Sequence, residues 1–229
     1  MLFGLLLIVG IGIAVAVGVF SYQAEQKRRA ALALWAQQRG WTYQRRDDAI
    51  LSRFDGSPFE TGHSRKATNV MVGTLGERRA AVFGFQYTVS NGKSSTTYHF
   101  RVFAVAMPCM VGHLSIKPEG LIAKLGNKLG FADVQLESEA FNHAFRLTAS
   151  SQKLAYDLVP ARTIDLLLGH RGTTIQTEGD LLTVVEDGRL DAVGLDGTLA
   201  MIDQFIDNVP PFVWNDHGAP RADDRPPAS

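Results

Sequence analysis

The pattern of apolar and polar positions sets the first part of the chain apart. Leu2 to Phe20, LFGLLLIVGIGIAVAVGVF, is a run of 19 residues without a charged or strongly polar side chain. As a helix rising 1.5 Å per residue, it spans about 28 Å, close to the hydrocarbon thickness of a bilayer. A cleaved signal peptide is the alternative, but no Lys or Arg precedes the run. The pattern therefore predicts a retained transmembrane anchor over residues 1–22.

The residues after this run predict its orientation. Lys27, Arg28 and Arg29 follow it, and no basic residue precedes it. The positive-inside rule then predicts a single-pass protein of the cytoplasmic membrane, with its N-terminus outside and its C-terminal domain in the cytoplasm. The net charge is zero overall, but residues 1–128 hold 16 basic against 7 acidic residues. We expect this basic half to face anionic lipids, so the lipid bilayer is the first predicted partner.

Small residues recur every four positions in the apolar run, at Gly10, Ala14 and Gly18. Small residues at this spacing let two membrane helices approach closely, which favours a homo-oligomer formed through this face. The alternative is that small residues are common in membrane helices for other reasons. A juxtamembrane helix is expected over residues 23–40, because Ala24 to Arg39 holds no Gly or Pro and Gly40 supplies a stop.

The remaining chain predicts an α+β domain over residues 41–217 whose antiparallel sheet lies mainly in the first half and whose helices lie mainly in the second. Alternating apolar positions indicate strands over 67–74, 79–89, 95–107, 112–117, 134–136 and 145–148. Segments 173–177 and 181–186 are expected to form a second hairpin around Glu178-Gly179-Asp180. Helices are expected over 119–129, 152–158, 161–169 and 191–208. Residues 218–229 lack large apolar side chains and predict a disordered tail.

The tripeptide Gly92-Lys93-Ser94 looks like the end of a phosphate loop, but its context excludes nucleotide binding. The motif needs a Gly five residues before Gly92, and that residue is Tyr87. The residues after Ser94 are rich in Thr, aromatic side chains and Val, as in a strand, whereas a phosphate loop is followed by a helix. We therefore expect no nucleotide and no other cofactor at this position.

The same stretch instead predicts a β-hairpin turning on Asn91-Gly92, a pair favoured in two-residue turns. Such a turn would place Phe85 opposite Tyr98 and Phe83 opposite Phe100. A shift of one residue would exchange the two faces, so the apolar matches support this arrangement.

Two pairs of residues are the candidates for catalysis or ligand binding. His99 and Arg101 share the more polar face of the hairpin, and Gly84 is expected to leave space opposite them. A solvated sheet face is the alternative. Glu139 and His143 lie four residues apart on a short helix, which puts them within reach for acid–base chemistry. Such pairs on helix surfaces are usually inert, and the remaining histidines have no metal-ligand spacing.

The run ESEAFNHAFRLTASSQKLAYDLVPARTIDLLL, Glu137 to Leu168, resembles uncharacterised bacterial single-span membrane proteins of a domain-of-unknown-function family. The segments RGWTY and PPFVW are also similar to such proteins. The resemblance implies a membrane-anchored cytoplasmic domain. It implies no activity and no catalytic residue.

These observations favour a membrane-tethered interaction or scaffolding module that is not an enzyme and that has an unknown protein partner. The alternative is a small-ligand-binding or hydrolytic domain with a site around His99 and Arg101. Nucleic acid is not expected as a partner, because the net charge is zero and the second half is acidic. The single cysteine, Cys109, excludes an internal disulfide.

Overall fold

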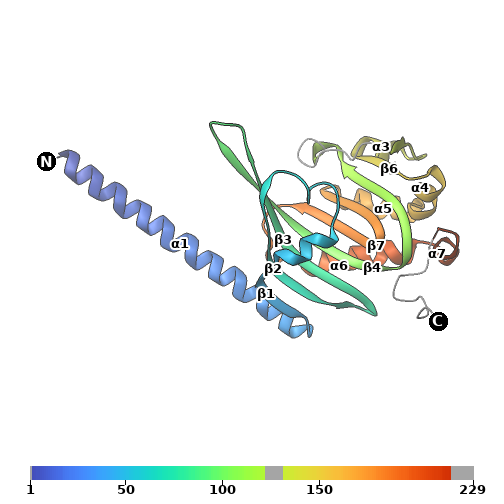
Figure 1. The fold of residues 1–229 in the computed structure, drawn as a ribbon, viewed down its shortest axis with the longest axis horizontal. Helices are drawn as coiled ribbons and strands as arrows, with labels where there is room; N and C mark the ends of the chain where they lie inside the picture. Colours follow the sequence, from blue (N-terminus) through green and yellow to red (C-terminus); the bar gives the residue numbers. More distant parts are fainter. Residues whose placement is uncertain (1, 122–130, 218–229) are drawn as a thin grey trace.

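The computed structural model describes residues 2–121 and 131–217, with side chains described for residues 16–120 and 131–216. It shows an α+β architecture in which helices pack on a seven-stranded antiparallel sheet (Figure 1). The α+β class expected from the sequence is confirmed. The expected tail at 218–229, most of the expected helix at 119–129, and the side chains of Gly10 and Ala14 lie outside the described residues.

The first four strands are consecutive in the chain and adjacent in the sheet. They are β1 (Thr42–Arg46), β2 (His63–Leu75), β3 (Arg78–Ser90) and β4 (Ser95–Pro118), and each pairs with the next in antiparallel fashion. A short 3₁₀ helix, η1 (Asp48–Arg53), lies between β1 and β2. The carboxylate of Asp47 caps the N-terminus of η1 by accepting a hydrogen bond from the amide of Ala49.

The long strand β4 organises the rest of the sheet. Its first half pairs with β3, and its last residues pair on the same edge with β6 (Phe145–Ala149), which pairs with β5 (Ala132–Val134). Strand β7 (Thr173–Asp187) pairs with the other edge of β4 along most of its length. Segments 95–107 and 112–117, expected as separate strands, are therefore the two halves of one strand.

The expected second hairpin around Glu178-Gly179-Asp180 is wrong. Both flanking segments belong to the continuous strand β7, in which Gly179 lies opposite Val111 where the register of β4 shifts. Gly179 has φ +59, a conformation that glycine adopts without steric cost. The extra residues at this point lie on β4, so β4 forms the bulge. The left-handed conformation of Gly179 lets β7 follow the resulting bend.

The hairpin between β3 and β4 is confirmed, but its register differs from the expected one by two residues. Phe85 lies opposite Phe100 and Phe83 lies opposite Val102. The connection has four residues instead of two, closed by Asn91 Oδ1, which accepts hydrogen bonds from the amide and hydroxyl of Ser94. Because side chains alternate with period two, a shift of two residues leaves every side chain on its expected face.

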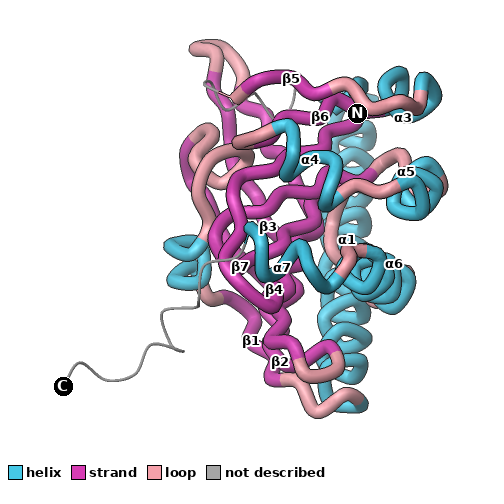
Figure 2. The backbone as a smooth tube through the Cα atoms, turned by 90° about the vertical axis from the view of Figure 1, so that its right-hand side faces the viewer, coloured by secondary structure: helices cyan, strands magenta, loops and turns pink. Residues whose placement is uncertain are grey.

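Helices cover one face of the sheet. The other face is covered by residues 48–59, which comprise η1 and the loop after it and which we call the η1 segment. The helices are α1 (Leu2–Gln38), α3 (Glu139–Ala144), α4 (Gln152–Leu158), α5 (Ala161–Leu168), α6 (Leu195–Asn208) and α7 (Pro211–His217), with a second 3₁₀ turn, η2 (Glu119–Leu121). Figure 2 shows α1, α5 and α6 on one side of the sheet. A large apolar core fills the helix side, and a smaller one around Phe54, Phe59, Phe83, Phe85 and Phe100 fills the η1 side.

Helix α1 is a single 37-residue element that extends away from the sheet (Figure 1). In the part of the chain that the structure describes, no helix is both long and apolar enough to cross a membrane. The expected N-terminal transmembrane helix, and with it the single-pass membrane class, is therefore wrong. Among the described side chains of α1, Glu25, Lys27, Arg28 and Arg29 follow Phe20 and bring charge onto the helix, which then docks onto the domain.

The C-terminal part of α1 is fixed to the domain by apolar and polar contacts. Leu32 and Ala36 are fully buried, and the Trp35 ring packs edge-on against Trp41 with centroids 5.3 Å apart. Trp35 Nε1 also donates a hydrogen bond of 3.0 Å to Asp196 in the first turn of α6. These contacts place α1 against the sheet beside α6, which determines the position of the pocket described further below.

Candidate functional site

A cavity of about 160 Å³ lies between the η1 segment and strands β4, β6 and β7. We call it the η1 cavity. Its lining comes from residues far apart in the sequence: Arg53, Phe54, Asp55, Gly56, Ser57, Phe59, His113, Ser115, Lys117, Phe131, Asp133, Arg146, Thr148, Gln176, Glu178, Leu181 and Thr183.

The sheet side of the η1 cavity is made by His113, Ser115 and Lys117. These residues alternate with Leu114 and Ile116, whose side chains are fully buried in the helix-side core. The alternation of a strand therefore turns the three polar side chains toward the η1 segment. All three are buried, with exposed fractions of 9%, 4% and 6%. Burying polar side chains costs free energy unless they find partners, so this arrangement is unusual for a purely structural strand.

Each of these three residues has a distinct environment. His113 Nδ1 lies 3.2 Å from Glu178 Oε2, and the His113 ring stacks on Phe131 with centroids 4.2 Å apart. Burial lowers the pKa of Lys117, and the nearby positive charge of Arg146 lowers it further. Ser115 Oγ is buried and has no hydrogen-bond partner among the described residues. A hydroxyl without a partner is suited to bind a ligand group or a water molecule.

The opposite wall is the η1 segment, held on the sheet by two aromatic anchors. Phe54 packs edge-on against Phe83 with centroids 5.3 Å apart, and Phe59 packs against Phe85 at 5.1 Å. The Gln176 amide also donates a hydrogen bond of 3.2 Å to the carbonyl of Ser57. The wall is thus tied to the sheet at both ends, and the cavity is formed before any ligand arrives.

The charges around the cavity balance. Arg53, Lys117 and Arg146 face Asp55, Asp133 and Glu178, so the lining holds three basic and three acidic residues. Arg146 donates two hydrogen bonds to Asp133, at 2.9 and 2.5 Å, which fixes both side chains. A lining that offers donors and acceptors in equal measure suits a neutral, hydroxyl-rich group better than an ion or an acyl chain.

The structure separates the two residues of the first sequence-predicted site. His99 and Arg101 lie on the helix side of the sheet, but they line different pockets. His99 is half-buried, and its pKa is lowered first by burial and then by the positive charges of Arg189 and Arg28. Arg101 forms an ion pair of 2.8 Å with Glu186 on β7. Gly84 lies opposite Arg101, whereas His99 lies opposite Gln86.

The second predicted pair lies on the surface. Glu139 and His143 are both exposed on α3. At the start of this helix, Ser138 Oγ accepts a hydrogen bond from the Phe141 amide, and Phe141 packs against Phe145. Among the residues that the structure describes, no group of three or more His, Cys, Asp or Glu side chains is placed to hold a metal ion.

The sequence held one signal for the η1 cavity that residue-type searches do not use. In HLSIK, residues 113–117, polar residues alternate with apolar ones directly after the long apolar run VFAVAMPCMVG. Such alternation at the end of a buried strand indicates a polar face within the fold. The sequence gives no comparable indication that Arg146, Gln176 and Glu178 line the cavity. Their place there depends on β6 and β7 pairing with β4.

The fold and the cavity together define an α+β domain with a polar cavity on one face of an antiparallel sheet. No protein-family model and no curated protein matches the sequence. The fold is similar to the crystal structure of the mycobacterial trehalose monomycolate transport factor A, TtfA, with a TM-score of 0.63. The alignment covers 84% of this chain and 98% of that chain at 14% sequence identity. At this identity, the likeness establishes a shared fold.

Proposed function

We propose that this chain is a non-enzymatic factor in lipid transport, and that its η1 cavity binds the polar head group of the transported lipid. The observation that carries the proposal is the cavity itself, in which the buried side chains of Lys117 and Ser115 lie within a lining of balanced charge. The fold supports it, because the similar structure belongs to a protein named as a transport factor for trehalose monomycolate, a lipid with a sugar head.

The size and chemistry of the cavity favour a head group over a whole lipid. Its volume of about 160 Å³ is close to that of five liquid water molecules and below the ~300 Å³ of a small drug-binding pocket. Most lining residues are charged or polar, whereas an acyl chain requires apolar walls. Phe54, Phe59 and Phe131 supply flat apolar surfaces beside the polar groups, an arrangement suited to the faces and edges of a sugar ring.

The described side chains favour binding over catalysis. Covalent catalysis needs a nucleophile within hydrogen-bond reach of a base. Ser115 Oγ has no hydrogen-bond partner among the described residues, and the His113 Nδ1 atom faces Glu178. The hydrolytic alternative at His99 and Arg101 loses its basis, because Arg101 is paired with Glu186 and the two residues line separate pockets.

Transport can be tested by replacing the native protein with Lys117→Met in the cell that makes it. Methionine keeps similar volume and removes the charged donor. Newly made lipids are pulse-labelled, and the fraction that leaves the membrane of synthesis is measured. We expect a labelled lipid to accumulate at its site of synthesis without chemical change, because the protein moves its ligand and does not modify it.

The matched control is Lys93→Met, which removes the same charge from the exposed hairpin turn. Normal lipid export with Lys117→Met, or an equal defect with both variants, would contradict the proposal. Accumulation of a chemically different lipid would contradict the non-enzymatic assignment.

A further inference from the structure

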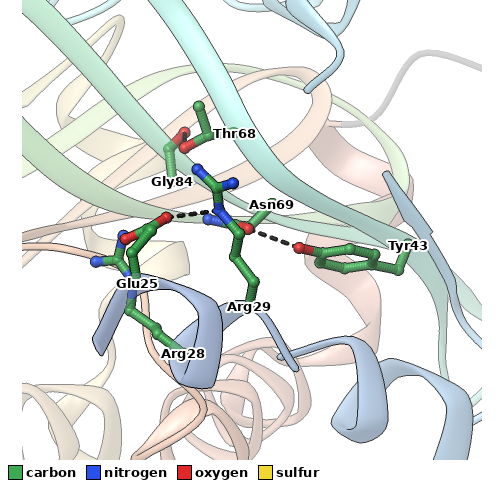
Figure 3. A network of polar contacts seen from close by, with 7 residues as sticks. All are labelled: Glu25, Arg28, Arg29, Tyr43, Thr68, Asn69 and Gly84. Atoms are coloured by element: carbon green, nitrogen blue, oxygen red, sulfur yellow. Dashed lines mark hydrogen bonds and ion pairs between the residues drawn. The ribbon is translucent and has the colours of Figure 1, made fainter. Parts of the chain in front are cut away.

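A second pocket, of about 260 Å³, lies on the opposite face of the sheet from the η1 cavity, where α1 passes over β2, β3 and β4. We call it the α1 pocket. Figure 3 shows its polar residues, with Glu25, Arg28 and Arg29 on the helix and Thr68, Asn69 and Gly84 on the strands beneath. Arg189, which follows β7, completes the lining together with His99.

The α1 pocket carries an excess of positive charge. Three arginines, Arg28, Arg29 and Arg189, line it, and Glu25 is the one acidic residue among its lining residues. The formal charge of the lining is therefore +2 with His99 neutral. Arginine side chains repel one another because they carry the same charge. The repulsion is stronger in a partly enclosed hollow, where the surrounding protein screens charges less than water does. Such a cluster is favourable when an anion occupies the space between the charges.

Glu25 neutralises only part of this positive charge. Its carboxylate accepts hydrogen bonds from Arg28 Nη2 and, at 2.7 Å, from Arg29 Nε. Arg28 Nε is buried and has no hydrogen-bond partner among the described residues. Arg189 is exposed and forms no ion pair with any described residue. One arginine donor within the pocket and one arginine at its edge thus remain available to a ligand.

A neutral donor is placed beside these charges by an irregularity of β2. Asn69 lies where the register between β2 and β3 shifts, with φ +51 in the left-handed region. It is 3% exposed, and its Oδ1 accepts a hydrogen bond of 2.7 Å from the Tyr43 hydroxyl. Because the oxygen is occupied, the amide nitrogen is the group that Asn69 offers to the pocket. Bulges that turn a side chain in this way are common beside binding sites.

We infer that the α1 pocket binds a phosphate group, held by Arg28, Arg29 and Arg189 with the Asn69 amide as a neutral donor. A phosphate monoester carries a charge of about −1.5 to −2 near neutral pH, which matches the excess of +2 in the lining. Guanidinium groups bind phosphate oxygens in a paired geometry that a lysine cannot reproduce. This inference is independent of the proposed lipid-transport function, because it concerns different residues on the other face of the sheet.

The test is calorimetric titration of the full chain with two probes. One is inorganic phosphate, and the other is dihexanoyl-phosphatidic acid below its micelle concentration, which carries the same group on a lipid. Arg189→Gln removes one cation from the pocket without disturbing the core, and Arg171→Gln removes one exposed cation outside it. We expect Arg189→Gln to weaken binding about tenfold, as the loss of one charged hydrogen bond predicts. We expect Arg171→Gln to bind as the unmodified chain does.

The two probes distinguish the source of the phosphate. Binding of both, weakened by Arg189→Gln alone, supports a site for the phosphate group itself. Binding of the lipid probe alone, with the same dependence on Arg189, supports a site for a lipid phosphate. The absence of binding by either probe, or an equal loss in both variants, would overturn the inference, because only the overall charge of the protein would then matter.

Discussion

Arg101 on β4 and Glu186 on β7 form an ion pair of 2.8 Å across neighbouring strands. Glu186 is 9% exposed, and its other carboxylate oxygen accepts a hydrogen bond of 3.2 Å from the Thr198 hydroxyl on α6. The pair therefore joins β4, β7 and α6 at one buried point. The arginine that the sequence suggested as a ligand-binding residue has a structural role in the fold.

The first prediction follows from this pair. Arg101→Met should lower the free energy of unfolding by about 3 kcal/mol, because it leaves the Glu186 carboxylate buried without its cation. The double variant Arg101→Met with Glu186→Leu should recover most of the loss, since both charges are then absent. Urea unfolding of the single and double variants measures both values. A single variant as stable as the unmodified protein would contradict the structural role.

The second prediction concerns Gly73, which lies beneath the Trp41 ring. A Cβ atom at Gly73 would lie 2.3 Å from Trp41 Cγ, closer than atoms can approach. Gly73→Ala should therefore cost about 1–3 kcal/mol of stability by overpacking. Gly197→Ala, at an exposed position of α6 with open space around it, should instead gain about 1 kcal/mol. Thermal unfolding of the two variants should show shifts of opposite sign.

The third prediction is a pH dependence caused by His99. Its pKa in the folded protein is lowered below 6.5 by burial and by Arg189 and Arg28, so the unfolded chain binds the proton more readily. Stability should fall as the pH decreases through 6.5 and level off below the folded pKa. His99→Gln should lose less stability than the unmodified protein over this range, and Arg189→Gln should weaken the dependence. Urea unfolding at several pH values tests this; identical profiles for His99→Gln and the unmodified protein would contradict it.

The sequence predicted the elements of this fold well wherever local signals determine them. Alternation located β3, β4 and β6, whose bounds lie within a few residues of the expected ones. The hairpin register differed by two residues because four-residue and two-residue turns both fit the Asn91-Gly92 signal. The period of the strands nevertheless preserved the faces.

The pairing of distant segments was not available from the sequence. Whether residues 173–186 form a hairpin or one strand depends on the bend in β4, since β7 pairs with β4 on both sides of that bend. The η1 cavity depends on the same pairing, because β7 brings Gln176 and Glu178 beside Lys117. The expected boundary between an anchor at residues 1–22 and a helix at 23–40 does not appear, because both segments belong to the continuous helix α1.

The fourth prediction concerns the cost of keeping Lys117 in the η1 cavity. Burial lowers its pKa, which means that the protonated side chain destabilises the folded state. Lys117→Met should therefore be as stable as the unmodified protein or more stable near neutral pH, although it removes a buried lysine. Urea unfolding measures this. A marked loss of stability would indicate that Lys117 supports the fold and is not retained for binding.

The most direct test of the proposed function is calorimetric titration of the full chain with glucose, one of the two sugar rings of trehalose, because a cavity of about 160 Å³ admits one ring and not the disaccharide. Our account predicts saturable binding by the unmodified protein and by Lys93→Met. It predicts binding weakened about tenfold in Lys117→Met, as expected for the loss of one charged hydrogen bond. Absence of glucose binding by the unmodified protein, or equal binding by Lys117→Met, would contradict the claim that the η1 cavity recognises a sugar ring of the head group.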